Sequence, residues 1–581
     1  MKKQIYKFIL CLLIVAFTAS LGACALRPRP ARTADKKTLL RLGFSGEPDS
    51  LNPYAAGNEE AAAVLSLLYD TLFTVDLDTG AVTGSLCQQC VVSNAAAGGQ
   101  LWRITLRDDA LWHDGTPVTA SDVEFSLQSA KDFSTLYGYP DCEFLDTTGI
   151  AVEDDTHLSM IVWGEQPFVA ECLSRVPIVP RSVWNRPESM QYSRAGIPAD
   201  RSRARQELYA ISADASTMIG SGLYVWGGYE DGVCTLKLNE NYWNGPADAQ
   251  VLELRFGLAD PAEAFLAGEI DACWDMPLRS WESLGEQGGV RLASGPTEEL
   301  YLLLINHRAG ANSALQNAYV RQALDESTDR AAILAEAFGG GVAEAGLLSP
   351  NSQWYYDVSA RPSYRSFDSA AAASLLEDAG YVDADGDGVR EAEGGKALSF
   401  RLLCSDAVPA WENACERLRQ ACALAGMELV ISVLPPEALL SALEAGEYDL
   451  CLTSRRTYLD PAYSLGMFYW NGGDNDAFFS DGRGRSVSRG WNESGYADEA
   501  VFDSYYEQMM RQQYPDVRSR LVSELGGLLY DTAAAVSLGF SARYQACTTV
   551  WSGLRPFRGE GAYFSPMTLR AQIQNMKAGG R

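Results

Sequence analysis

An acidic turn in the second half of the chain has the residue types of a cation site. Asp383, Asp385 and Asp387 place carboxylates at positions 1, 3 and 5 of a segment in which Gly388 takes position 6. This spacing matches the start of a calcium-binding EF-hand loop. However, Gly394 stands at position 12, where such a loop needs a bidentate acid. We therefore expect a plain turn without metal, and keep the three aspartates as the alternative cation site.

Cys24 is a candidate for covalent lipid chemistry. It ends a leucine-glycine-alanine-cysteine run that follows three lysines and a mostly apolar stretch over 8–21. The stretch is shorter than the ~20 residues of a membrane-spanning helix, so it predicts a signal peptide over 1–23. Its ending resembles a bacterial lipobox, whose small residues give the processing enzymes access to the cysteine. We expect a lipidated Cys24 that anchors the protein to the membrane outside the cytoplasm, with 24–36 as a flexible tether.

Cys87 and Cys90 form the one close pair among thirteen cysteines. A single Cys-x-x-Cys without a second pair does not predict a zinc site, and a redox role needs a thioredoxin-like setting. Because an extracytoplasmic compartment is oxidising, we expect a structural disulfide between them. Unpaired thiols, a metal site and a redox role stay open as alternatives.

Catalytic signatures are missing. The sequence has no GxSxG or HExxH motif and no Cys/His signature. The pairs Asp474/Asp476 and Glu298/Glu299 could be offered as glycosidase acids, but pairs arise by chance among 75 acidic residues. We expect no enzyme, and an anchored hydrolase is the alternative.

The length and the net charge of the chain narrow the classes of protein to which it can belong. The chain has 581 residues, of which 47% are hydrophobic, which is typical of a globular protein with several domains or sub-domains. The formal net charge of −28 disfavours nucleic acid as a partner, because a polyanion would be repelled. The three histidines, His113, His157 and His307, are too few for a histidine-rich metal site. We interpret His113 as structural.

The hydrophobic pattern predicts an α/β protein. Strands are expected over 398–403 and 428–433, and helices over 409–425 and 436–445. This alternation favours a lobe with a mainly parallel sheet. Further expected elements are strands over 39–44, 101–106 and 158–163, a hairpin over 224–238, and helices over 61–72, 119–130, 315–338 and 501–529.

Several motifs follow one another along the chain in a fixed order. The longest covers 106–123 and contains a Leu-Trp-His-Asp-Gly-Thr-Pro run over 111–117. The others lie at 46–53, 220–224, 241–245, 267–271, 320–324, 375–381, 446–449 and 460–461. Together they resemble the bacterial extracellular solute-binding proteins of family 5, the peptide/nickel ABC-importer class. The resemblance extends over about 39–565.

This resemblance implies a two-lobed periplasmic-binding-protein-like fold of the large, type II peptide-binding class, with a hinge and an extra sub-domain. The implied division is lobe I over 37–75, 218–305 and 540–575, an appended sub-domain over 76–217, and lobe II over 306–539.

The resemblance also implies a function. A peptide is captured between the lobes and delivered to the permease of an ABC importer, by a monomer without a cofactor. Closure between lobes buries a ligand, and anchoring keeps the binding protein near its permease. Alternatives with the same fold are an oligosaccharide, nickel-chelate or haem binder, a peptide-signal receptor and a chaperone.

Candidate pocket residues follow from the same resemblance. Backbone groups at Gly46 and Glu47 and the loop before an Asp-Pro motif are expected to hold the main chain of a peptide. In this loop we assign Asp460 to the ligand ammonium and Arg455 or Arg456 to its carboxylate. Tyr458 and Trp411 are possible walls. The usual Gly-Trp is replaced here by 453–457, and Asp460 could instead cap a helix ahead of Pro461.

Overall fold

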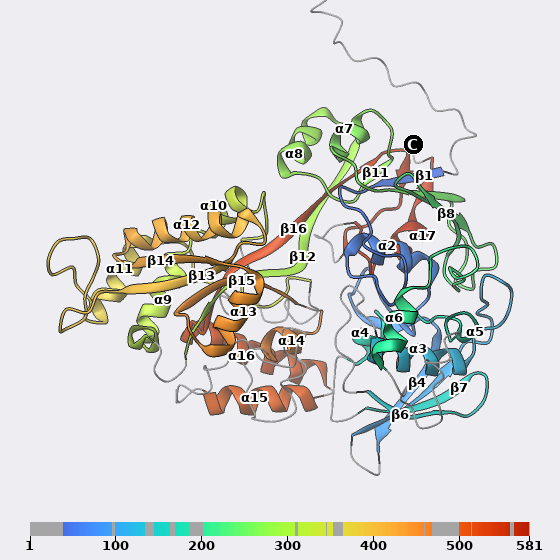
Figure 1. Cartoon of the computed structure of the whole chain (residues 1–581), viewed down its shortest axis with the longest axis horizontal. Helices are drawn as coiled ribbons and strands as arrows, with labels where there is room; N and C mark the ends of the chain where they lie inside the picture. The colour runs from blue at the N-terminus through green and yellow to red at the C-terminus, as the bar shows by residue number, and fades with distance from the viewer. Residues whose placement is uncertain are drawn as a thin grey trace, which may run out of the picture.

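Two lobes joined by two long strands make up the protein in a computed structural model (Figure 1). The described residues are 39–95, 99–133, 145–162, 169–185, 201–307, 312–343, 345–351, 364–457, 459–466, 499–512, 514–557 and 563–579. The predicted signal peptide, Cys24 and the tether lie outside them. Among the described helices, none has the length and apolar character needed to cross a bilayer.

Lobe II, on the left in Figure 1, is built around β13 (Ser399–Ser405), β14 (Glu428–Leu434) and β15 (Leu450–Arg456). Strand β13 pairs in parallel with both of the others. Helices α12 (Pro409–Leu424) and α13 (Pro436–Ala445) connect these strands. The predicted alternation of strands and helices, with its parallel sheet, is confirmed.

More helices complete lobe II. Asp329 accepts a hydrogen bond from the backbone N–H of Ala332 at 3.1 Å and caps α10, at the break predicted within 315–338. The segment predicted as helical over 501–529 is two helices, and the second begins at Pro515, because proline fits a first turn but not a helix interior. The elements are η3 (Ser313–Gln316), α9 (Ala318–Glu326), α10 (Arg330–Ala337), α11 (Ser369–Asp378), α14 (Pro461–Gly466), α15 (Glu499–Arg511) and α16 (Pro515–Thr532).

In lobe I, β1 (Leu39–Gly43) lies parallel to its two neighbours in the sheet. The predicted hairpin is formed by β8 and β9, and Asp231 and Gly232 between them both have positive φ, as a two-residue type I′ turn requires. The remaining elements are α2 (Glu59–Leu68), β8 (Tyr224–Glu230), β9 (Val233–Leu238), β10 (Val251–Arg255), α7 (Pro261–Leu266), β11 (Ala272–Cys273), α8 (Leu278–Gln287), β17 (Trp551–Ser552), α17 (Leu569–Asn575) and β18 (Lys577–Ala578).

An antiparallel sub-domain is attached to lobe I. Its four strands have the order β4-β5-β7-β6. Asp122 accepts the backbone N–H of Thr119 at 2.9 Å and so closes the start of α3, where the sequence predicts a capped helix. The elements of this region are β2 (Phe73–Val75), β3 (Val82–Gly84), β4 (Cys87–Asn94), β5 (Gln100–Leu106), α3 (Ala120–Phe133), β6 (Leu145–Val152), β7 (His157–Val162), α4 (Val169–Leu173), α5 (Arg181–Trp184) and α6 (Arg201–Tyr209).

Two long antiparallel strands, β12 (Val290–Ile305) and β16 (Ala535–Thr548), run through both lobes. Strand β16 pairs with β11 in lobe I, and β12 pairs with β15 in lobe II. Ten of the described strands therefore form one sheet in the order β14-β13-β15-β12-β16-β11-β1-β10-β9-β8. The passage between lobes lies inside these strands, near the register shift between Pro296 and Leu300. The predicted lobe limits stay a proposal.

Asp70 is a fully buried carboxylate that joins distant parts of lobe I. It accepts hydrogen bonds from the Tyr242 hydroxyl and the Trp243 indole, both at 3.0 Å, and from Ser221 at 3.2 Å. It also forms an ion pair with Arg570 of α17. The polar side-chain groups of the 241–245 motif thus bind a buried carboxylate.

His113 has a structural role, as its sequence context suggests. Its Nδ1 accepts the Gly220 N–H at 3.1 Å, which leaves Nε2 to donate to the Gly222 carbonyl at 3.2 Å. Burial lowers the pKa of His113, which favours this neutral form. A Cβ on Gly220 would lie 1.8 Å from the Leu68 carbonyl oxygen, so this motif needs glycine.

The predicted Cys87–Cys90 disulfide is wrong. Both residues are free thiols. A bulge in β4 pairs Cys87 with Leu106 and Cys90 with Ile104, which puts both thiols on one face of the strand. The two thiols interact through a hydrogen bond that, with burial, raises the pKa of Cys87.

We expect Asp70→Asn to lower the free energy of unfolding by about 3–5 kcal/mol, because Arg570 would remain buried without its counter-charge. Asp78→Asn is the matched control, since Asp78 and Arg555 form an exposed ion pair with side chains 65% and 55% accessible. That change should cost less than about 1 kcal/mol. Chemical denaturation of both variants measures the difference, and equal small losses would contradict a central role for Asp70.

Candidate functional site

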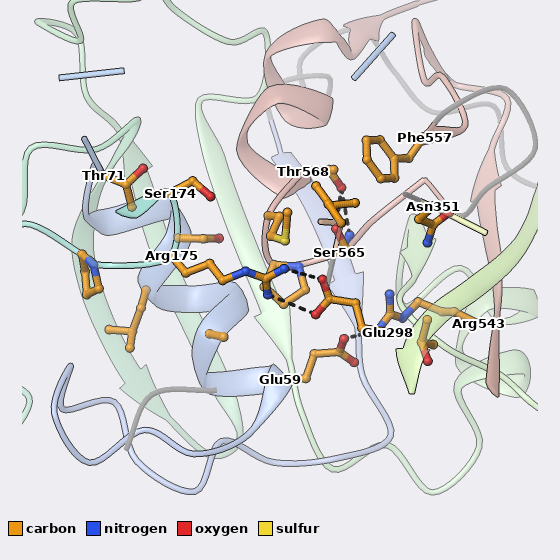
Figure 2. Close-up of a pocket in the computed structure, with 18 of the residues that line it drawn as sticks. Glu59, Thr71, Ser174, Arg175, Glu298, Asn351, Arg543, Phe557, Ser565 and Thr568 are labelled. Atoms are coloured by element: carbon orange, nitrogen blue, oxygen red, sulfur yellow. Dashed lines mark hydrogen bonds and ion pairs between the residues drawn. The ribbon is translucent and has the colours of Figure 1, made fainter. Parts of the chain in front are cut away.

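A cavity of about 130 Å³ lies between the lobes and is the candidate ligand site (Figure 2). With its opening to solvent, the hollow measures about 1080 Å³. Lobe I contributes α2, the turn after α4 and the segment before α17, and lobe II contributes Asn351 and Leu459. The crossing strands contribute Glu298 and Arg543. Segments that are distant in the sequence therefore meet around one space.

The first charged group in the cavity is the pair between Arg175 and Glu298. Figure 2 shows the guanidinium of Arg175 facing the Glu298 carboxylate, with one hydrogen bond to each oxygen, of which the Nη1–Oε2 bond measures 3.0 Å. The arginine side chain is only 6% exposed, whereas that of Glu298 is 20% exposed. The carboxylate therefore presents the more accessible edge of this pair to a ligand.

The second charged group is the pair between Arg543 and Glu59. Glu59 is the first residue of α2, where the helix dipole favours a negative charge. Its other oxygen accepts the Trp274 indole N–H at 3.2 Å, and Arg543 also donates to the Phe564 carbonyl at 3.2 Å. Again the arginine is the more buried partner, since its side chain is 8% exposed and that of Glu59 is 22% exposed.

Apolar side chains form other walls of the cavity. Leu65, Leu459 and Phe557 are buried and line it, together with Pro177 and Met567. Ion pairs beside apolar walls suit a molecule that carries charges of both signs and apolar groups. The positive and negative groups of such a ligand can take the place of the arginine or the glutamate in these ion pairs.

Glu171 connects the sub-domain of lobe I with lobe II. Its two carboxylate oxygens accept the backbone N–H groups of Leu459 and Asp460 at 2.9 and 2.7 Å, and Arg175 donates to it at 3.1 Å. Burial raises the pKa of Glu171 to about 7, Arg175 opposes this shift, and the carboxylates of Asp460 and Glu298 add to it. The cavity is therefore closed on this side by a contact between lobes.

Asp460 lies at this junction, but its carboxylate has protein partners. It forms two hydrogen bonds with Arg518, at 2.6 and 2.7 Å, and accepts the Ala462 N–H at 2.9 Å. It therefore caps α14 ahead of Pro461, which is the alternative that the sequence left open. With 6% exposure, it is not among the described residues that line the cavity.

The predicted arginines lie at the end of β15. Arg456 places its Nε 4.0 Å from Glu298 Oε2, at the edge of the charged group. Arg455 donates to the Ser454 carbonyl at 3.3 Å. Tyr458 falls outside the described residues.

Trp411, Gly46 and Glu47 are not among the described residues that line this cavity. Trp411 packs edge-on against Tyr301 and Phe338 in the core of lobe II, with ring centroids 5.7 and 5.2 Å apart. Glu47 is exposed, and its carbonyl accepts from Asn58, the N-cap of α2. Their roles as ligand contacts stay predictions.

The acidic turn is exposed. The carboxylates of Asp383, Asp385 and Asp387 come within 4.8 Å of one another, together with Glu391, which the sequence analysis did not name. These carboxylates accept backbone N–H groups of the turn itself, such as Gly386 at 2.7 Å. The turn is thus held by its own hydrogen bonds, and the cation site over these carboxylates stays the alternative.

Sequence reasoning missed most of the charged cavity residues. Glu298 was named only in the Glu298/Glu299 pair of the alternative hydrolase, and Asp474 and Asp476 lie outside the described residues. Glu59, Arg175 and Arg543 had no local signal, because their partners are up to 484 positions away. The one sequence pattern that indicates a buried charge here is an arginine within an otherwise mostly apolar strand, as Arg543 is in β16.

Two relatives match this chain, one over most of its length and one over 59% of it. The probable D,D-dipeptide-binding periplasmic protein DdpA of Escherichia coli (strain K12) is 24% identical over 522 residues, which is 89% of this chain and 90% of that protein. The periplasmic murein peptide-binding protein MppA of the same organism is 24% identical over 365 residues, 59% of this chain and 62% of that protein.

Solved structures share the fold. The periplasmic oligopeptide-binding protein of an oligopeptide ABC transporter from Thermotoga maritima superposes with a TM-score of 0.71 at 19% identity, covering 94% of this chain and all of the other. The profile of the bacterial extracellular solute-binding proteins, family 5 (middle part), matches residues 92–476. With two lobes on a pair of crossing strands and a cavity between them, the chain belongs to the bacterial extracellular solute-binding proteins of family 5.

Proposed function

We propose that this chain is the extracytoplasmic binding component of an ABC importer, and that it captures a short peptide in the cavity between its lobes. The observation that carries the proposal is the cavity itself, which has two arginine–glutamate pairs beside apolar walls and is lined from both lobes. The relatives named as peptide-binding proteins support the peptide as ligand.

A zwitterionic peptide matches these charges. The carboxylates of Glu298 and Glu59 are the more exposed partners of their pairs, so they can receive an ammonium group without a large rearrangement. Each arginine can then bind a carboxylate of the ligand, which replaces the glutamate as its counter-charge. In a partly dry cleft such charge-assisted contacts are strong. We therefore assign the ammonium to Glu298 rather than to Asp460, whose carboxylate is held by Arg518.

The transport role needs a location and a partner. We propose that Cys24 is lipidated, that the protein is anchored to the membrane outside the cytoplasm, and that a monomer delivers its ligand to the permease subunits. Anchoring raises the effective concentration of the binding protein near the permease.

The identity of the ligand is tested by native mass spectrometry of the gently purified protein, followed by calorimetric titration with di-, tri- and tetrapeptides. A bound mass that fragments into amino acids, and peptide binding by titration, are the expected results. A co-purifying oligosaccharide, nickel chelate or haem, without peptide binding, would contradict the peptide and leave the family intact. Turnover of a peptide or glycoside would contradict a binding role.

Glu298→Gln should weaken peptide binding by about 1.5–3 kcal/mol, the usual range for a hydrogen bond to a charged group. The control is Glu299→Gln, because Glu299 is the next residue in β12, is exposed and does not line the cavity. Calorimetry should find its affinity unchanged. Equal affinities for the two variants would show that Glu298 does not hold the ligand.

Asp460→Asn should behave differently. It removes the counter-charge of buried Arg518, so we expect the free energy of unfolding to fall by about 3 kcal/mol. Any protein that remains folded should bind peptide as the unchanged chain does. A loss of affinity at unchanged thermal stability would restore Asp460 as the ammonium partner.

Cys24→Ala should release the protein from membranes or leave the unprocessed form, since the lipid can no longer be attached. Cell fractionation and intact mass measure this. Cys90→Ala, in the body of the protein, is the control and should stay on the membrane. If both variants stay there with the mass of the mature protein, lipidation at Cys24 is wrong.

A further inference from the structure

The two lobes meet at a short segment just before α14. There the carboxylate of Glu171, on α4 in the sub-domain of lobe I, accepts the N–H groups of both Leu459 and Asp460 from lobe II. The distances of 2.9 and 2.7 Å are those of full hydrogen bonds. Glu171 is only 4% exposed, so the contact is shielded from water.

A second, apolar contact lies beside it. The side chain of Leu459 packs into a cluster with Val75, Leu77 and Phe557 of lobe I. All four are buried, with exposures between 3% and 8%. The lobe II segment is therefore held to lobe I by a backbone contact on one side and by its leucine on the other.

This double contact lies at the cavity. Leu459 lines the cavity, and so does Arg175, which binds both Glu171 and Glu298. The lobes cannot separate around the cavity without breaking the Glu171 hydrogen bonds and exposing Leu459. Glu171, Leu459 and the N–H of Asp460 are called the clasp below.

We propose that the clasp holds the two lobes closed over the cavity, through the acceptor oxygens of the Glu171 carboxylate and the apolar side chain of Leu459. The inference rests on the proposed function only in taking the cavity as the ligand site. Opening and closing can be measured without any ligand.

The charges around Glu171 come from every element packed against it. Arg175 lies one turn further along its own segment, Glu298 comes from β12, and Asp460 stands at the start of α14. Arg518 of α16 neutralises Asp460, and Arg456 of β15 lies near Glu298. Two carboxylates thus compete for the positive charge of Arg175. With burial, this raises the pKa of Glu171 to about 7 in the closed form.

The clasp uses Glu171 as an acceptor of hydrogen bonds. Both of its oxygens accept backbone N–H groups, and Arg175 donates a further hydrogen bond. An amide in place of the carboxylate would set an N–H group against one of these donors. Loss of either acceptor oxygen should therefore weaken the closed form.

The test is small-angle X-ray scattering of the protein without added ligand. We expect Glu171→Gln to increase the radius of gyration, because one acceptor oxygen is lost and the amide N–H group faces a backbone N–H donor. Glu326→Gln is the matched control, because Glu326 lies at the end of α9 and does not line the cavity. It should leave the radius of gyration unchanged.

Leu459→Ala removes the apolar part of the clasp alone. It should also shift the protein toward the open form. Scattering of Glu171→Gln and Leu459→Ala identical to that of the unchanged chain would overturn the clasp. Peptide titrations of the same variants separate the clasp from the proposed peptide binding. A variant can lose the clasp and still bind peptide, and a variant can keep the clasp and fail to bind peptide.

Discussion

The antiparallel pairing of β12 with β16 is the constraint on which the rest of the structure depends. Because both strands pass from lobe I to lobe II in one hydrogen-bonded ribbon, the lobes can move relative to each other only if that ribbon bends or twists. The register shift between Pro296 and Leu300 falls where the lobes meet and marks the place where bending is easiest. Glu298 and Arg543 belong to this ribbon, so the cavity charges sit at the pivot rather than on a moving surface.

Buried charge explains how the cavity is built. An arginine in a dry space needs a counter-charge, and Glu298 and Glu59 supply it for Arg175 and Arg543. For the peptide proposed as ligand, the same pairs supply groups of both signs. Glu171 extends this network across the cleft, which couples the charge state of the site to the contact between lobes.

The local elements followed well from the sequence. The helix expected over 409–425 is Pro409–Leu424, and the helix expected over 436–445 has those bounds, because each carries an apolar face at the helical period and a proline in its first turn. The pocket followed less well. Asp460 was chosen for its place before a proline, yet that place makes it a helix cap. Spacing cannot tell a capping acid from a ligand-binding one, because both stand at helix starts.

The sequence by itself determined the family, the α/β class and the turn and cap chemistry, since these depend on residues within a few positions of one another, as in the 106–123 motif. The tertiary structure decided which charges meet. Glu59 and Arg543 stand 484 positions apart and touch because α2 and β16 pack around one cavity. It also decided that Cys87 and Cys90 are thiols in a bulged strand. Long-range contacts of this kind depend on how whole elements pack, which local periodicity does not encode.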